Sequence, residues 1–310
     1  MSDTPRRVVT AGETMALLDP LDEGELELEG LLRLRFAGAE SNFAVGLTRL
    51  GVPVTWISRL GADRIGGLVR STLASEGVDV RFVREDPGAP TGLYLKWRED
   101  GRTSVAYYRR GSAASRLAVG DVPDEALAGA ALVHLTGITM ALGPGTRELV
   151  LDVARRAREG GAIVMFDPNF RPALWDGPEA AAAAMEPVLE HVDWYLCGAE
   201  EGGALFGTDD VVAALRARGV PGAVVRLGAR GALVASGSSV EEVAPRATEA
   251  VVDEIGAGDA FAAGFAYGVL QGWEPAAATR AAHVIAAAAL RGTGDWETLP
   301  RLDEVRELLS

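Results

Sequence analysis

Short apolar runs alternate along the chain with longer segments in which apolar residues recur every three or four positions. Because parallel strands need long crossover connections, this alternation predicts a mainly parallel sheet covered by helices. The predicted strands are 8–11, 54–60, 132–136, 162–166, 193–197, 223–227, 231–235 and 240–243. The predicted helices follow the turns at Gly38 and near Asp259, and also span 64–76, 146–159, 179–189, 199–206, 211–218 and 275–290.

Two stretches do not fit this alternation. The acidic, leucine-rich stretch 13–36 has no helical period and predicts short strands that leave the main sheet. The stretch 92–110 predicts a β-hairpin, because its central Asp100-Gly101 is a favoured two-residue turn. The cross-strand pairs that follow from this turn are Arg98 with Thr103 and Tyr94 with Tyr107.

The predicted hairpin has two chemically different faces, since successive side chains of a strand point to opposite sides. One face carries two phenols, a lysine and a guanidinium, and the other is apolar enough to pack. The polar face is either a ligand-binding surface or the ordinary solvated side of an antiparallel sheet. The polar face comprises Tyr94, Lys96, Val105, Tyr107 and Arg109, and the apolar face Leu93, Leu95, Trp97, Ala106 and Tyr108.

The composition is that of an ordinary globular protein, with 48% hydrophobic and 24% charged residues. A net charge of −14 argues against a nucleic-acid or anionic-membrane partner, because both attract basic patches. Lys96 is the only lysine. An anionic ligand must therefore be bound by arginine, by backbone N–H groups or through a metal.

The single cysteine and the lack of a long apolar segment indicate a cytoplasmic protein. Cys197 cannot form an internal disulfide, and a lone cysteine fits a reducing compartment, most often as a small buried apolar residue. The polar residues before Val8 are not typical of a signal peptide. The apolar run 281–290 is too short to span a bilayer.

A glycine-rich turn before a helix, near the C-terminus, offers a binding site for a phosphate. Gly256 and Gly258 let a ligand approach the backbone, and the helix N-terminus supplies unpaired N–H groups and a positive dipole end. Asp259 lies in the first turn, where its carboxylate either caps the helix or accepts a proton from a bound ligand. A plain glycine-rich helix start fits this short motif equally well. Arg171 follows the predicted strand 162–166 and is a second candidate anion ligand, because ligands bind at the carboxyl ends of parallel strands.

Several familiar catalytic motifs are absent from the sequence. It contains neither the G-x-x-x-x-G-K-[ST] phosphate loop nor the protein-kinase motif set, and it has no G-x-S-x-G. The histidines His134, His191 and His283 are not spaced as metal ligands. P-loop, protein-kinase and serine-hydrolase chemistry are therefore disfavoured.

Three motifs, in their order and separations, resemble those of the ribokinase-like (phosphofructokinase B) sugar kinases over nearly the whole chain. They are Gly38-Ala39 with Asn42, the turn 226–231, and the segment 253–259. Within that family, further segments are similar to the 2-keto-3-deoxygluconate kinases. These segments are 11–13, 92–94, 107–113, 169–171, 174–175 and 291–295.

The resemblance implies a ribokinase-like three-layer α/β sandwich with a mainly parallel central sheet and a small β lid. It implies one domain over 1–310, with the lid formed by about 13–36 and 90–112. ATP and Mg²⁺ would be the cofactors, and a monovalent cation is left open. A homo-oligomer is expected, because lid strands in this family often pair between subunits.

The resemblance also implies roles for individual residues. Asp259 would accept the proton of the attacking sugar hydroxyl, and the backbone of Gly256, Ala257 and Gly258 would form an anion hole for the γ-phosphoryl group. The substrate would be bound by Gly38, Asn42, Tyr94, Tyr107, Arg109, Arg171 and Asp295. The nucleotide would be bound by Arg226, Gly228, Gly231, Gly258 and His283, and Glu201 and Asp253 would act on the metal.

Two positions depart from the family's pattern. The usual Asn-x-x-Glu falls at 198–201, so Glu201 is kept while Gly198 replaces the asparagine that acts on the metal and phosphates. Glu254 replaces a usual threonine, which we interpret as tolerated variation.

The function implied is ATP-dependent phosphorylation of 2-keto-3-deoxygluconate to 2-keto-3-deoxy-6-phosphogluconate. One alternative is a neutral-sugar kinase of the fructokinase or ribokinase type. The other, suggested by Gly198, is a catalytically weak protein that binds sugar and nucleotide.

Overall fold

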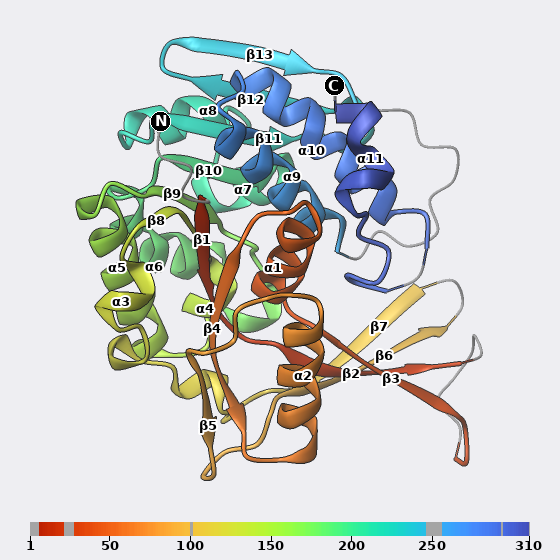
Figure 1. Ribbon diagram of the computed structural model, residues 1–310. Helices are drawn as coiled ribbons and strands as arrows, with labels where there is room; N and C mark the ends of the chain where they lie inside the picture. Colours follow the sequence, from red (N-terminus) through yellow and green to blue (C-terminus); the bar gives the residue numbers. More distant parts are fainter. Residues whose placement is uncertain (1–5, 22–27, 100–101, 246–255, 293, 310) are drawn as a thin grey trace.

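A large β-sheet forms the centre of the computed structural model, which describes residues 6–21, 28–99, 102–245, 256–292 and 294–309 (Figure 1). Its strands are β1 (Arg7–Ala11), β4 (Val54–Gly61), β5 (Val83–Asp86), β8 (Ala130–Thr136), β9 (Ile163–Asp167), β10 (Trp194–Gly198), β11 (Gly222–Arg226), β12 (Ala232–Ser236) and β13 (Ser239–Val243). The order β5-β4-β1-β8-β9-β10-β11 is parallel throughout, and β12 and β13 add antiparallel strands at the β11 edge. The predicted mainly parallel sheet is confirmed.

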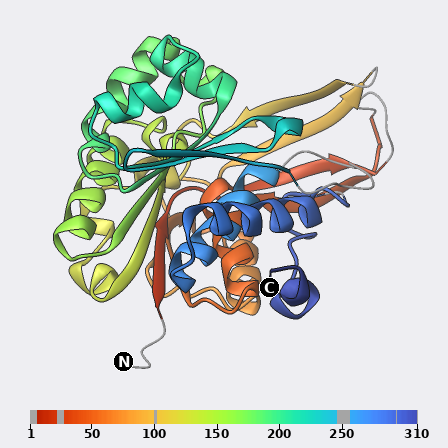
Figure 2. The same cartoon turned by 90° about the horizontal axis from the view of Figure 1, so that it is seen from above.

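Helices cover both faces of this sheet and make three layers (Figure 2). One face carries α1 (Ala39–Arg49), α2 (Arg64–Ser75), α9 (Ala257–Gln271) and α10 (Pro275–Ala289), with α11 (Leu302–Leu309) beside them. The other carries α3 (Asp124–Leu127), α4 (Gly137–Met140), α5 (Pro144–Glu159), α6 (Pro178–Leu189), α7 (Ala199–Phe206) and α8 (Val211–Ala217). Short 3-10 turns lie at Ala114–Arg116, Val119–Asp121, Pro172–Leu174 and Gly228–Arg230.

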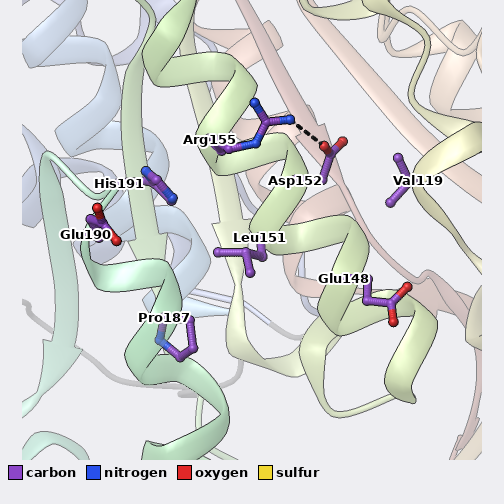
Figure 3. Close-up of a pocket in the computed structure, with 8 residues that line it drawn as sticks. All are labelled: Val119, Glu148, Leu151, Asp152, Arg155, Pro187, Glu190 and His191. Carbon is purple, nitrogen blue, oxygen red and sulfur yellow. Dashed lines mark hydrogen bonds and ion pairs between the residues drawn. The ribbon is translucent and has the colours of Figure 1, made fainter.

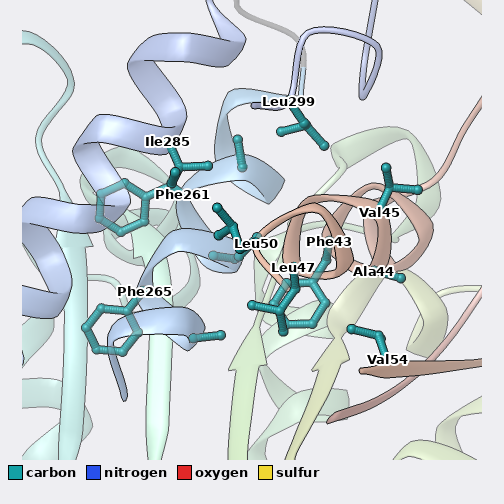
Figure 4. Close-up of a cluster of buried hydrophobic side chains, with 14 of the residues drawn as sticks. Phe43, Ala44, Val45, Leu47, Leu50, Val54, Phe261, Phe265, Ile285 and Leu299 are labelled. Carbon is teal, nitrogen blue, oxygen red and sulfur yellow. The ribbon is translucent and has the colours of Figure 1, made fainter. Parts of the chain in front are cut away.

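Helices α1 and α9 pack together in the hydrophobic core on one face of the large sheet. Phe43 and Leu47 recur at helical spacing on α1 and are fully buried in the same hydrophobic cluster as Phe265 of α9 (Figure 4). On the far side of α9, the close approach of α10 requires glycine. A Cβ added to Gly264 would lie 2.7 Å from the Cα of Ala282. This packing fixes the N-terminus of α9 relative to α1.

A second sheet of four strands projects from the body, and we call it the lid (Figure 1). Its strands, in the order β3-β2-β6-β7, are β2 (Met15–Pro20), β3 (Leu32–Ala37), β6 (Leu93–Glu99) and β7 (Arg102–Tyr108). The predicted pairings of Tyr94 with Tyr107 and Arg98 with Thr103 are confirmed. The turn residues 100 and 101 themselves lie outside the described residues.

Helix α9 begins at Ala257, with Gly256 as its N-cap, so Asp259 lies in its first turn as predicted. Several short elements were not predicted, among them the four-residue helices α3 and α4. The four-residue strand β5 was not predicted, because it is too short to show a period. Helix α11 was also missed, although it packs Val305 into the core.

Candidate active site

A cavity of about 940 Å³ lies between the lid and the carboxyl ends of β8, β9, β10 and β11. All of the predicted site residues that the structure describes line it. The polar face of the lid hairpin therefore meets the glycine-rich turn of α9, although more than 140 residues separate them in sequence. Asp253, the remaining predicted residue, lies outside the described residues.

The glycine-rich turn presents the N-terminus of α9 to the cavity. Gly256 has a φ of 78°, in the left-handed region, and a Cβ on it would lie 2.2 Å from the carbonyl oxygen of Asp295. Glycine is therefore required twice, for conformation and for space. No side chain caps this helix end among the described residues, so the first N–H groups of the helix are available to an anion.

Asp259 is held by an asparagine of α1. The Nδ2 of Asn42 donates a hydrogen bond of 2.8 Å to the Oδ2 of Asp259. Burial raises the pKa of Asp259 to about 7, the Asn42 bond opposes this rise, and the negative charge of Asp167 adds to it. A carboxylate with a pKa near neutrality suits a general base.

The lid contributes a pair of tyrosines to the opposite wall. The rings of Tyr94 and Tyr107 lie with centroids 5.7 Å apart, and the hydroxyl of Tyr94 donates to the Oδ2 of Asp295 at 3.3 Å. Burial raises the pKa of Tyr94, so it remains a neutral donor. The lid is thereby tied to the same segment that packs on Gly256.

Arg109 lies beside these tyrosines but is already paired with a buried carboxylate. Its Nε donates to the Oε2 of Glu13 at 2.7 Å, and Ser112 donates to the Oε1 of Glu13 at 2.5 Å. Both Arg109 and Glu13 are buried. The Glu13 carboxylate thus offsets the positive charge of Arg109, which the sequence predicted to bind the substrate.

Arg171 differs from Arg109, because it is exposed and forms no ion pair in the described part of the chain. It follows β9, where Asn169 adopts a left-handed φ of 39° and donates its N–H to the Oδ1 of Asp167 at 2.9 Å. The positive charge of Arg171 lowers the pKa of Asp259. Arg171 is therefore the more available guanidinium for an anionic ligand.

The carboxylate of Glu201 links two strand ends by hydrogen bonds. Its Oε1 accepts the N–H of Phe170 at 2.5 Å, and its Oε2 accepts the N–H of Gly198 at 2.9 Å. Burial and the neighbouring charge of Asp167 raise the pKa of Glu201. A Cβ on Gly198 would meet nothing closer than 3.8 Å, so the missing asparagine side chain leaves open space.

The end of the cavity near β11 is built from glycines and small apolar side chains. Gly231 has a φ of 98°, and a Cβ there would lie 2.2 Å from the carbonyl oxygen of Val243. His283 lines this end, and burial lowers its pKa, so it is neutral. Ala286, Ala287 and Leu290 of α10 and its C-cap complete the wall.

Unpaired buried acceptors also point to a ligand. The Oδ1 atoms of Asn42 and Asn169 are buried and have no hydrogen-bond partner within the described residues. Buried polar groups are nearly always satisfied, so a bound ligand or water is expected to donate to them.

A second, smaller hollow of about 440 Å³ lies between α5 and α6 (Figure 3). Its wall carries Glu148, Glu190 and His191, and Asp152 there is paired with Arg155 at 3.0 Å. None of the predicted site residues lies in it. The described residues contain no group of three His, Cys, Asp or Glu side chains placed to hold a metal ion.

Two smaller predictions concern the rest of the chain. Cys197 is buried, as expected, and burial raises the pKa of its thiol well above the usual value. Among the helices that the structure describes, none has both the length and the apolar character needed to cross a membrane.

The chain matches a known enzyme family over nearly its whole length. The model of the pfkB family carbohydrate kinases matches residues 5–302. The chain belongs to this family of sugar kinases. As a pfkB family member it is a carbohydrate kinase, as the motifs at 38–42, 226–231 and 253–259 predict.

Several relatives match the chain over nearly its full length. A 2-dehydro-3-deoxygluconokinase of Bacillus subtilis strain 168 is 34% identical over 307 residues, covering 97% of this chain and 95% of the relative. A 2-dehydro-3-deoxygluconokinase of Thermoproteus tenax is 36% identical over 310 residues, covering 97% and 94%. A putative ribokinase II of E. coli, solved with ATP and Mg²⁺, has a TM-score of 0.90 at 26% identity and 98% coverage of both chains. The predicted ribokinase-like fold is confirmed.

Sequence reasoning gave no role to several cavity residues. Asp167 was placed at the end of its strand and Lys96 on the polar hairpin face, and both line the cavity. The partner of Arg109, Glu13, was also missed, because it is 96 residues away and lies in a segment without a period. The carboxyl-end position of Asp167 was the available signal.

Proposed function

We propose that the chain transfers the γ-phosphoryl group of ATP to the 6-hydroxyl of 2-keto-3-deoxygluconate (2-dehydro-3-deoxygluconate). The observation that carries this proposal is that one cavity holds a cation free to bind a carboxylate together with a candidate base. Arg171, the lid tyrosines, Asp259 and the N-terminus of α9 all line this cavity, and the positive charge of Arg171 acts on Asp259. A sugar acid would bind there with its carboxylate on Arg171 and its terminal hydroxyl at Asp259. The names of the two relatives agree with this substrate.

The described residues fit a phosphoryl transfer. Asn42 donates a hydrogen bond to the Oδ2 of Asp259. The Oδ1 of Asp259 receives no hydrogen bond from the described residues, so it is available to the attacking hydroxyl. Asp259 accepts the hydroxyl proton while the N–H groups at the start of α9 bind the oxygens of the transferring group. Such transfer needs mainly positioning and charge stabilisation.

Mg²⁺ neutralises phosphate charge in such reactions and would enter with the nucleotide. Both oxygens of Glu201 accept backbone N–H bonds, so we expect Glu201 to act on the ion through water. The open space at Gly198 has room for that water.

A neutral-sugar kinase is the second candidate, and one observation favours it. Because Arg109 is paired with Glu13, its positive charge is neutralised and it contributes little to binding a carboxylate. Incubation with ATP and Mg²⁺, followed by NMR of the product, separates the candidates. We expect 2-keto-3-deoxygluconate to gain a phosphate ester on its C6 oxygen. Phosphorylated fructose together with unreacted keto acid would select the second candidate.

The pH dependence follows from the pKa of Asp259, which is about 7. Only ionised Asp259 accepts a proton, so kcat/KM is expected to fall about tenfold per pH unit below pH 7 and to level off above it. The Asn42 bond lowers this pKa, so Asn42→Ala is expected to move the acid limb to higher pH. Initial rates between pH 5 and 9 measure both, and an acid limb near pH 4 would contradict the assignment.

We also propose a homo-oligomer formed through the outer face of the lid. Leu34, Leu18, Leu95 and Ala106 form one continuous apolar row across all four lid strands. Leu34 is 46% exposed, and none of the helices that the structure describes covers this face in Figure 1. An uncovered apolar sheet face of this kind fits a second copy of the chain.

Sedimentation velocity tests this interface. Leu34→Glu is expected to lower the oligomeric state, because it places a charge in the apolar row. Leu308→Glu changes a similarly exposed leucine on α11 (42%) and serves as the control. A wild-type monomer at all concentrations, or an unchanged Leu34→Glu oligomer, would overturn the proposal.

A further inference from the structure

Arg226 lies directly against the glycine-rich turn. It ends β11, and its Nη1 is 3.4 Å from the carbonyl oxygen of Gly258. Its guanidinium carbon lies 5.9 Å from the ring centre of Phe261, one helical turn further along α9. The guanidinium therefore forms part of the cavity wall where the N–H groups of α9 emerge.

Two carboxylates flank this guanidinium without saturating it. Nη1 is 3.3 Å from the Oδ2 of Asp167, and Nη2 is 3.7 Å from the Oε2 of Glu201. Burial works to lower the pKa of Arg226, but these two charges raise it overall, so the side chain stays cationic. Its nearest contact to a carboxylate is longer than the 2.7 Å bond that holds Arg109 to Glu13. A guanidinium has five N–H donors, so several of those on Arg226 remain for a ligand.

The charge balance of the cavity favours a cation at this place. Asp167, Glu201 and Asp259 all line the cavity around the glycine-rich turn, and a nucleotide brings further negative charge. The described cavity wall contains four lysine and arginine side chains, and only Arg226 contacts the turn. The other three are Lys96, Arg109 and Arg171.

We propose that Arg226 is a catalytic residue that donates hydrogen bonds to the γ-phosphoryl oxygens during transfer, and that Asp167 positions it. This inference rests on the proposed kinase reaction and adds a role within it. The acceptor hydroxyl oxygen forms the new bond to phosphorus, and its proton goes to Asp259. The bond from phosphorus to the bridging oxygen breaks, and ADP leaves with that electron pair. Arg226 stabilises the charge on the transferring oxygens, so it acts more strongly on the transition state than on bound ADP.

The test compares Arg226→Met with Arg306→Met, a control at an exposed arginine of α11 outside the cavity. Arg226→Met is expected to lower kcat by about 100-fold or more, while the Kd for ADP with Mg²⁺ changes less than about threefold. Arg226→Lys is expected to recover part of the rate, because it restores a cation but not the planar fork. Arg306→Met is expected to leave both quantities unchanged.

Two further measurements keep the test decisive if Arg226→Met does not fold. Asp167→Asn removes the positioning charge but keeps the side-chain shape, and is expected to lower kcat about tenfold at unchanged ADP affinity. In Arg226→Ala, added guanidinium ion is expected to restore part of the turnover. Equal losses in ADP affinity and kcat, or a Lys variant no better than Met, would overturn the proposal. Any sugar that the wild type phosphorylates serves here, so an error in the proposed substrate leaves this test intact.

Discussion

Replacing Asp259 by asparagine is expected to lower kcat about 1,000-fold, within the range for loss of a general base. The amide has nearly the same shape and cannot accept the proton of the attacking hydroxyl. The N–H groups of α9 remain in place, so nucleotide affinity is expected to change little. Single-turnover rates and calorimetric titration with ADP and Mg²⁺ measure the two effects separately. A variant with a near wild-type rate would refute Asp259 as the base.

The same variant is expected to be more stable than the wild type at alkaline pH. The pKa of Asp259 is about 7 in the folded protein, against about 3.9 in an unfolded chain, so the folded state binds the proton more tightly. Ionising this half-buried carboxylate therefore costs stability as pH rises through this window, at most on the order of 4 kcal/mol in total. The difference in unfolding midpoint between Asp259→Asn and wild type should be small at pH 4 and should grow toward pH 8. A difference that does not vary with pH would contradict the raised pKa.

Replacing Arg171 by methionine is expected to separate sugar acids from neutral sugars. Arg171 is exposed in the cavity and forms no ion pair within the described residues, so its guanidinium is free to bind a carboxylate. We expect kcat/KM for the keto acid to fall about 10- to 100-fold, the usual effect of losing a charged hydrogen-bond donor, and that for fructose to change little. Steady-state rates with both substrates measure the ratio.

Arg110→Met removes an exposed arginine next to the lid and outside the cavity, and it is the control. Arg109→Met should behave differently from Arg171→Met, because it leaves the buried Glu13 carboxylate without its partner. Its main effect is expected to be a loss of folding stability of about 3 kcal/mol or more, with similar rate losses for both substrates. Equal losses for acid and neutral sugars in Arg171→Met would remove the argument for a carboxylate ligand.

The lid shows how far local patterns determine structure. The Asp-Gly turn fixes which residues pair, and the strand period fixes which face they share, so the pairing of Tyr94 with Tyr107 was predictable. The same rules carry no information about what lies opposite that face. The cavity wall on the far side comes from α1, α9 and the strand ends, and only the fold brings these together.

The charges of the site were less predictable than its location. The sequence shows Arg109 and Arg171 as equivalent candidates for binding the substrate. In the structure Arg109 is paired with Glu13, and only Arg171 of the two is available to a ligand. The contacts of Arg226 with Asp167 and Glu201 join three separate strand ends. Pairings between residues so far apart in sequence leave no periodic signal, so they could be found only in the structure.

The central claim is that this kinase acts on a carboxylate-bearing sugar held over Asp259. The most direct measurement is kcat/KM for 2-keto-3-deoxygluconate, fructose and ribose with the purified wild-type chain, ATP and Mg²⁺. We expect the value for the keto acid to exceed both others by about 100-fold, matching the free energy of a charge-assisted contact. A value for fructose or ribose equal to or above that for the keto acid would contradict the claim.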